Sequence, residues 1–283
     1  MTAIHIGIGG WTFPPWRGAF YPAGLPHAQE LRYASTRLTS IEINATFYGS
    51  QKPASFAKWR DETPDNFVFS VKAPRVATHR RALGESAASI TRFLQSGLTE
   101  LGGKLGPILW QFPPTRQFDP AALQPFLDLL PAAHDGLPLR HAIEARHPSF
   151  ADPAWMAMLR HAGAAHVIVE SENHTLRGDL TAGFVYARLQ RNAEAEPEGY
   201  SAAGLDQWAE RLRRWRAGET VTDLPAAAAA TPGPRDCFAY FISGDKVRAP
   251  IAAQALLARV LAPVLAPVLA PVLAPVLAPL AES

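Results

Sequence analysis

The feature that most constrains the fold is a series of short β-type runs separated by helix-type segments. Apolar and β-branched residues dominate the runs, and several end in a charged or amide residue at or near a proline. Parallel strands need a crossover connection, so this alternation predicts parallel βαβ units. We expect eight strands, at Ile4–Gly9, Ser40–Asn44, Phe67–Lys72, Pro107–Gln111, Leu139–Glu144, His166–Glu170, Phe184–Leu189 and Phe238–Ile242.

Helices are predicted between most of these strands. Asp119–Pro120 and Asp152–Pro153 each place an N-cap residue before a proline in the first helical turn. The link Glu170–Gly183 is short and polar, so we expect the sixth helix to be short or missing. The expected helices are His27–Leu38, Ala54–Glu62, Glu85–Leu101, Pro120–Leu130, Pro153–His161 and Ala202–Ala217, with a last helix from Ala249–Pro250 to about Leu261.

Together these elements predict an α/β fold of the (β/α)8 TIM-barrel type. The chain of 283 residues is long enough, since such barrels typically run to about 250 residues. A hydrophobic content of 48% with 18% charged residues is typical of a globular protein with a sizeable core. We expect residues 1–261 to form the barrel domain.

The C-terminal segment is a tandem repeat of Ala-Pro-Val-Leu that begins at Ala262. By hydropathy alone Val260–Ala281 is long enough for a membrane span. Proline at every fourth position opposes a helix, and an extended strand cannot satisfy its backbone in a bilayer. We therefore expect residues 262–283 to form an extended or disordered tail, with a docking tail as the alternative and no membrane partner.

Charge and cysteine content exclude several classes of protein. The formal net charge is +2 and no run of lysine or arginine suggests a nucleic-acid-binding tail. The single cysteine, Cys237, excludes an internal disulfide framework and a zinc site built from several cysteines. Ile4–Gly9 reads as a strand where a signal peptide would lie, so we expect a cytoplasmic protein.

Polar side chains gather at the C-terminal ends of the expected strands. The two-residue period of a strand puts Glu42 and Asn44 on the face opposite Ile41 and Ile43. The same parity applies to Lys72, Gln111, Glu144, Arg146 and Arg188. Because the carboxyl ends of barrel strands meet at one face, we expect these residues to share one mouth. The alternative is a purely structural network of salt bridges that closes the barrel.

Each of these residue types suits a role in a site for a small anionic ligand. Catalysis is assigned to Glu42, Lys72 and Glu144. Substrate binding is assigned to Trp11, Asn44, Tyr48, Gln111, Arg146 and Arg188. Cations hold an anion by charge-assisted hydrogen bonds, carboxylates transfer protons, and amides orient hydroxyl groups. Aromatic rings suit the face of a sugar or base.

Other interpretations of the same residues stay open. Lys72 is either a Schiff-base amine or a charged structural lysine. His79 and His147, in loops after two of the strands, are alternative acid–base groups. Carboxylates with these histidines suit a divalent metal, but the nearby cations oppose it. We therefore expect no metal and no cofactor.

Several longer motifs are shared with a known family. They are Ile6–Trp11, Trp16–Pro22, Ile41–Tyr48, Phe69–Pro74, Thr78–His79, Ile108–Pro114, Ala142–Phe150 and Tyr186–Leu189. On these motifs the chain resembles the YecE-like family of uncharacterised TIM barrels, domain of unknown function 72, from Ile4 to Leu261. The resemblance implies a barrel with these positions at its mouth and implies no reaction. Arg188–Arg191 lacks a histidine that the family often has, and Phe241–Asp245 lacks a pair of asparagines.

These observations lead to three functional hypotheses. The preferred one is an enzyme acting on a small polar anionic ligand, sugar- or nucleotide-like and in some cases phosphorylated, at the C-terminal face. The second is a metal-dependent nucleic-acid processing barrel with the architecture of endonuclease IV. The third is a non-catalytic ligand-binding barrel.

Overall fold

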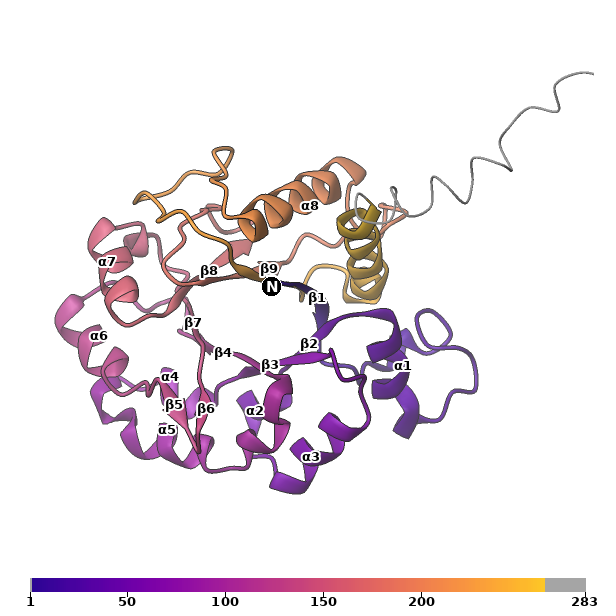
Figure 1. Ribbon diagram of the computed structural model, residues 1–283, viewed down its shortest axis with the longest axis horizontal. Helices are drawn as coiled ribbons and strands as arrows, with labels where there is room; N and C mark the ends of the chain where they lie inside the picture. The colour runs from indigo at the N-terminus through magenta and orange to yellow at the C-terminus, as the bar shows by residue number, and fades with distance from the viewer. Residues whose placement is uncertain (1, 263–283) are drawn as a thin grey trace, which may run out of the picture.

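The computed structural model describes residues 2–262, which form a closed parallel barrel (Figure 1). The strand order around the barrel is β1-β10-β9-β8-β7-β4-β3-β2. The strands are β1 Ile4–Gly9, β2 Ser40–Ile43, β3 Val68–Lys72, β4 Leu105–Gln111, β7 His141–Glu144, β8 Ala165–Glu170, β9 Phe184–Leu189 and β10 Asp236–Phe241. The TIM-type barrel is thus confirmed, and each predicted strand is present with small shifts at its ends.

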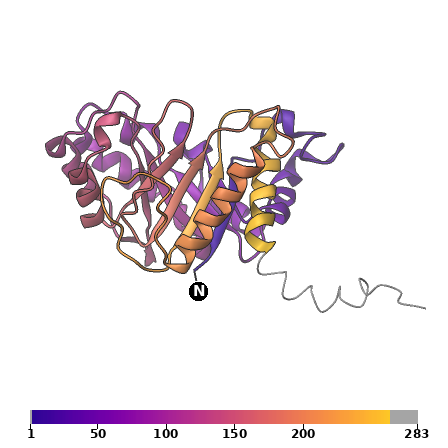
Figure 2. The same cartoon turned by 90° about the horizontal axis from the view of Figure 1, so that it is seen from above.

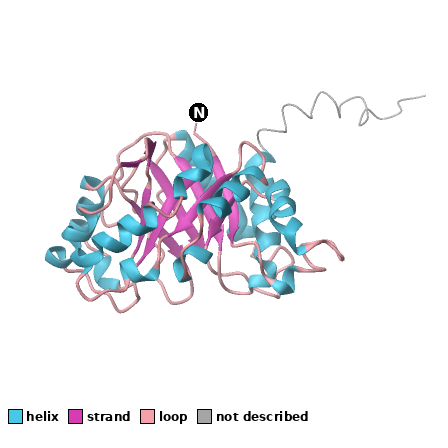
Figure 3. Cartoon of the chain, turned by 90° about the horizontal axis from the view of Figure 1, so that it is seen from below, coloured by secondary structure: helices cyan, strands magenta, loops and turns pink. Residues whose placement is uncertain are grey.

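Helices surround the barrel, as the views from the side show (Figures 2 and 3). They are α1 Glu30–Arg37, α2 Ala45–Tyr48, α3 Pro53–Asp61, α4 Arg75–Thr78, α5 Ala87–Leu94, α6 Pro120–Leu127, α7 Pro153–His161 and α8 Ala202–Ala217. Residues 249–262 are also helical, as the sequence predicts. Within the described part of the chain, no helix has both the length and the apolar character needed to cross a membrane.

Three local features differ from the expectations. The single helix predicted over Glu85–Leu101 is wrong, because α5 ends at Leu94 and Gly97 adopts a φ of 97°, which suits glycine alone. The short helices α2 and α4 and a small hairpin, β5 Ala133–His134 with β6 Leu137–Pro138, were not predicted. Residues 171–183, all described, contain no helix, as expected. Apart from residue 262, the expectation of a tail falls outside the described residues.

The strand parity inferred from the sequence holds in three dimensions. Ile41 and Ile43 pack outward in the large core between barrel and helices. Leu109, Tyr186 and Tyr240 belong to a second apolar cluster inside the barrel. The barrel interior is therefore a packed core, and charged side chains lie at its two ends.

Both predicted aspartate caps are present. The Asp119 carboxylate accepts a hydrogen bond from the backbone N–H of Ala121 at 3.0 Å. Asp152 accepts one from Ala154 at 2.8 Å. Each cap satisfies a backbone donor that the first turn of the helix leaves without a partner.

Removing one of these caps should have a measurable cost. We expect Asp152→Ala to lower the free energy of unfolding by about 1 kcal/mol, the usual cost of losing an aspartate cap. Urea unfolding measures the change. Asp65→Ala is the matched control, since Asp65 is exposed and its side chain makes no hydrogen bond to another described residue. Equal midpoints for the two variants would contradict the capping role.

Candidate active site

A buried ionic network lies at the carboxyl end of the barrel, with Arg188 of β9 at its centre. The Arg188 Nε and Nη2 donate to the two carboxylate oxygens of Glu42, each at 3.0 Å. Its Nη1 donates to Glu144 Oε2 at 2.5 Å. The Tyr186 hydroxyl donates to Glu42 at 2.8 Å. The guanidinium thus joins β2 and β7 across the interior of the barrel.

Burial makes this network unusual for charged residues. Arg188 is 2% exposed, and Glu42 and Glu144 are fully buried. Desolvation by burial acts to lower the pKa of Arg188, but the charges of Glu144 and Glu42 more than reverse this effect and hold the pKa above its ordinary value. Buried ions of opposite sign stabilise each other in this way only when the hydrogen bonds are well formed.

The second oxygen of Glu144 is also fully engaged. It accepts hydrogen bonds from Arg146 Nε at 2.5 Å and from Gln111 Nε2 at 2.9 Å. Burial alone would raise the pKa of Glu144, but Arg188, Arg146 and Gln111 hold this pKa down at about 2. Glu144 is therefore a carboxylate anion that orients the side chains around it.

Lys72, at the end of β3, is in a different environment. Its side chain is buried, and Nζ lies 4.0 Å from the centre of the Phe47 ring. Among residues 2–262, no acceptor forms a hydrogen bond with this amine. Burial, and next the charge of Arg188, lower its pKa to about 8. At pH 7 about one tenth of the amine is thus neutral, a far larger share than in an ordinary lysine.

A cavity of about 640 Å³ opens above the ionic network. Its basic lining residues are Lys72, Arg146, Arg188 and Lys246, and no aspartate or glutamate of the described chain lines it. Trp11 and Trp59 form an aromatic wall, with ring centres 5.2 Å apart and planes at 78°. The volume is in the range of about 300–1,000 Å³ typical of small-molecule sites.

All nine residues singled out in the sequence lie at this one end of the barrel. Those that line the cavity are Trp11, Asn44, Tyr48, Lys72, Gln111, Arg146 and Arg188. Tyr48 is 84% exposed and marks the rim. Glu42 and Glu144 do not line the cavity but lie beneath it, hydrogen-bonded to Arg188. The site therefore has two layers, which strand parity alone does not reveal.

Three cavity residues were missed by sequence reasoning. Lys246 and Ser243 follow the last strand, where the rule of polar strand ends could have found them. The ammonium of Lys246 lies 4.4 Å from the centre of the Phe13 ring. Trp59 belongs to α3, and no local signal in a helix indicates that its ring reaches the mouth. Ser243 also lies in the segment that departs from the family motif.

The groups considered for metal binding are dispersed. Within the described range, no three His, Cys, Asp or Glu side chains are placed to hold a metal ion together. Glu170 accepts a hydrogen bond from Trp208 at 3.0 Å and another from Tyr200. His79 packs edge-on against Phe47, and neither His79 nor His147 lines the cavity.

Comparison with known proteins places the chain in a family. The sequence model described as "Protein of unknown function DUF72" matches residues 5–272. The chain belongs to the DUF72 family. UPF0759 protein YecE of Escherichia coli K12 is 33% identical over 150 residues, which cover 52% of this chain and 50% of YecE. The chain thus matches about half the length of this curated relative. The resemblance seen in the sequence motifs is confirmed.

Solved structures of DUF72 members share the barrel. A DUF72 family protein from Thermotoga maritima MSB8 has a TM-score of 0.69 and 24% identity, covering 90% of this chain and 98% of that one. One from Enterococcus faecalis V583 has a TM-score of 0.65 and 15% identity, covering 91% and 95%. At these identities the likeness shows a common fold.

Proposed function

We propose that this DUF72 protein is an enzyme that acts on a small polar anionic ligand, sugar- or nucleotide-like and in some cases phosphorylated, at the mouth of the barrel. The observation that carries the proposal is the lining of the 640 Å³ cavity, where four basic side chains face the space. Two buried carboxylates beneath the cavity, Glu42 and Glu144, pair with Arg188. The excess of positive charge in a partly enclosed site favours an anion.

Arg146 and Arg188 are suited to hold that anion. Arg188 cannot rotate freely, because two carboxylates fix its guanidinium from both sides. Arg146 bonds Glu144 through Nε, and within the described chain no acceptor meets its terminal nitrogens. These nitrogens remain able to make charge-assisted hydrogen bonds to a carboxylate or phosphate. Asn44 and Gln111 lie beside them to orient hydroxyl groups.

Lys72 is the group we assign to proton transfer or to attack on a carbonyl carbon. An amine with a pKa of about 8 is a better base and nucleophile near pH 7 than an ordinary lysine. Sequence analysis assigned catalysis to Glu42 and Glu144 as well. Their hydrogen bonds to Arg188 favour an orienting role for both carboxylates.

The anion can be identified directly. We expect mass spectrometry of denatured, purified protein to reveal a bound anionic metabolite, and Arg146→Ala to reduce its amount by about tenfold, the effect of one charge-assisted hydrogen bond. Calorimetry with sugar phosphates and nucleotides then gives the affinities. Arg32→Ala, on the exposed face of α1, is the matched control. Equal amounts of the same anion in wild type and Arg146→Ala would contradict the assignment.

Two other functions would use the same cations, and experiments distinguish each of them from the proposed enzyme. A nucleic-acid processing barrel predicts retention of DNA that weakens steeply with salt, since phosphate contacts release counterions. A non-catalytic binding barrel predicts that the purified protein binds the ligand without converting it to a product. Conversion of the ligand by the wild type that is lost in Lys72→Met, with ligand binding retained, supports the enzyme.

A further inference from the structure

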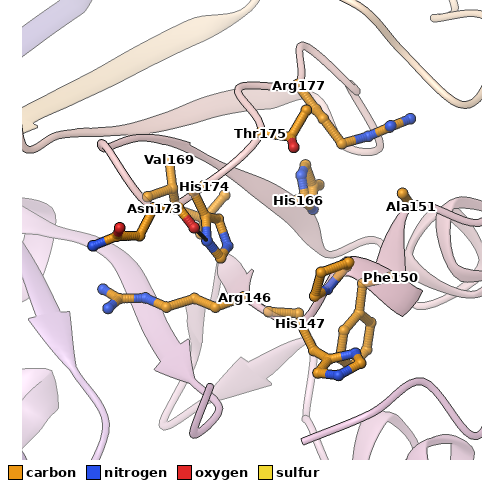
Figure 4. A pocket seen from close by; sticks show the side chains of 13 residues that line it. Arg146, His147, Phe150, Ala151, His166, Val169, Asn173, His174, Thr175 and Arg177 are labelled. Carbon is orange, nitrogen blue, oxygen red and sulfur yellow. Dashed lines mark hydrogen bonds between the residues drawn. The ribbon is translucent and has the colours of Figure 1, made fainter. Parts of the chain in front are cut away.

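A second, smaller cavity of about 180 Å³ lies at the junction of β7 and β8 (Figure 4). The hydrogen-bonded ladder between these strands has two residue pairs and ends at Ile143 with His166. Beyond this point the cavity is lined by Arg146, which follows β7, and by Val167 and Val169 of β8. The short ladder therefore leaves room in the barrel wall, next to the main site.

The missing sixth helix shapes the outer side of this cavity. The loop after β8 takes the place of that helix and contributes Asn173, His174, Thr175 and Arg177 to the lining. The basic side chains around the space are Arg146, His147, His166, His174 and Arg177. In the part of the chain that the structure describes, no carboxylate lines it.

His166 is the most buried of these groups. It is 8% exposed, and its Nδ1 is buried without a hydrogen-bond partner among the described residues. Figure 4 shows its ring projecting into the space that the labelled side chains surround. A buried nitrogen without a partner costs free energy, so a polar group that reached it here would be bound more favourably. Burial lowers the pKa of His166 to about 4, although Asp179 acts to raise it.

Arg177 is held in place from behind. Its Nε donates to Asp179 at 3.2 Å. The buried Asp179 also accepts hydrogen bonds from the backbone N–H groups of Ala227 at 2.7 Å and Ala228 at 3.1 Å. No acceptor in residues 2–262 bonds the terminal nitrogens of Arg177. A positioned guanidinium with free donors is a typical partner of an oxyanion.

We propose that this cavity is a binding site for a phosphate group, held by Arg177, His166 and His174, with Arg146 as the wall shared with the main cavity. Its volume corresponds to about six water molecules in the liquid, which suits a phosphate with a few carbons and excludes a nucleoside. The phosphate comes either from free inorganic phosphate or from the second phosphate of a ligand whose body lies in the main cavity. Only the second source rests on the proposed function.

Inorganic phosphate is the first probe. In a titration of the full chain followed by NMR of the histidine side chains, we expect a saturable shift of the His166 signals and a rise of its pKa from about 4. His166→Phe keeps an aromatic ring and removes both nitrogens, and Arg177→Met removes the cation. Each variant should weaken phosphate binding by about tenfold or more. His161→Gln and Arg32→Met, both exposed, should leave it unchanged.

Three outcomes of this titration overturn the proposal. The first is the absence of a saturable His166 shift in the wild type. The second is phosphate binding that survives both His166→Phe and Arg177→Met. A loss of binding confined to Lys246→Met would put the phosphate in the main cavity and also overturn it, while leaving the proposed function intact.

A glucose bisphosphate compared with a glucose monophosphate separates the two sources. Tighter binding of the bisphosphate, weakened by Arg177→Met and by Lys246→Met alike, supports one ligand that spans both cavities. If the two sugars bind equally well and Arg177→Met still loses the binding of inorganic phosphate, the result supports a separate site for the free anion. In that case the small site stands even if the proposed function fails.

Discussion

Replacement of Arg188 by methionine is expected to lower the free energy of unfolding by about 3–5 kcal/mol, because it leaves two carboxylates in the barrel without their shared cation. Arg188 supplies three hydrogen bonds to Glu42 and Glu144, and all three side chains are nearly or fully buried. Chemical denaturation at pH 7 measures the loss. Arg146→Met, which removes a half-exposed partner of Glu144, is the matched control and should cost less.

A second variant distinguishes lost charge from lost packing. Combining Arg188→Met with Glu42→Gln and Glu144→Gln should recover part of the stability, since a buried ion cluster can be replaced by neutral groups at little cost. Lowering the pH gives another check. The pKa of Glu144 is depressed to about 2, so its contribution to stability is present above pH 4.5 and is lost as the pH falls toward 2. An unchanged unfolding midpoint in Arg188→Met would contradict the buried network.

Replacement of Lys72 by methionine is expected to raise the free energy of unfolding while strongly reducing turnover. The folded-state pKa of about 8 lies below the ordinary value of 10.5, so the unfolded chain binds more protons between these two values. The cost of burying the charge is therefore fully present below pH 8 and is relieved as the pH rises toward 10.5. At pH 7 the variant should gain about 3 kcal/mol, at about 1.4 kcal/mol for each unit of the difference between the two pKa values.

The free energy of unfolding measured at pH 7 and at pH 10 tests the direction of this effect. The advantage of Lys72→Met over wild type should shrink at the higher pH, and Lys52→Met, on an exposed side chain, should show neither effect. With a substrate in hand, turnover should fall by about 100-fold or more in Lys72→Met, the usual contribution of an acid–base group. A variant that is less stable than wild type at pH 7 would show that Lys72 is a structural lysine.

A group that lowers stability and lines a cavity points to function more strongly than a paired ion does. Arg188 and Glu144 stabilise each other, so their burial alone is compatible with a structural network. Among the residues that the structure describes, Lys72 has only the Phe47 ring and more distant charges to offset its burial. The contrast between the two substitutions therefore separates the structural layer of the site from the layer that meets the ligand.

The local pattern of residues in the sequence was sufficient to predict much of the fold. The two-residue period of a strand separated Glu42 from Ile41 and Ile43, and the structure has Glu42 inside the barrel and both isoleucines outside. A barrel strand that is buried on both faces has room for charged groups only at its ends, which is why the cluster at the carboxyl ends was visible in the sequence. The caps at Asp119 and Asp152 are likewise contacts between near neighbours in the chain.

By itself the sequence determined the barrel type, the inward face of five of the strands and the end at which the polar residues of the site meet, because these follow from period and chain direction. Only the tertiary structure decided which charges are paired. It placed Glu42 and Glu144 under Arg188, brought Trp59 and Lys246 to the mouth, and ended the β7–β8 ladder early enough to open the small cavity. Such contacts depend on distances between residues far apart in the chain, and no local spacing encodes them.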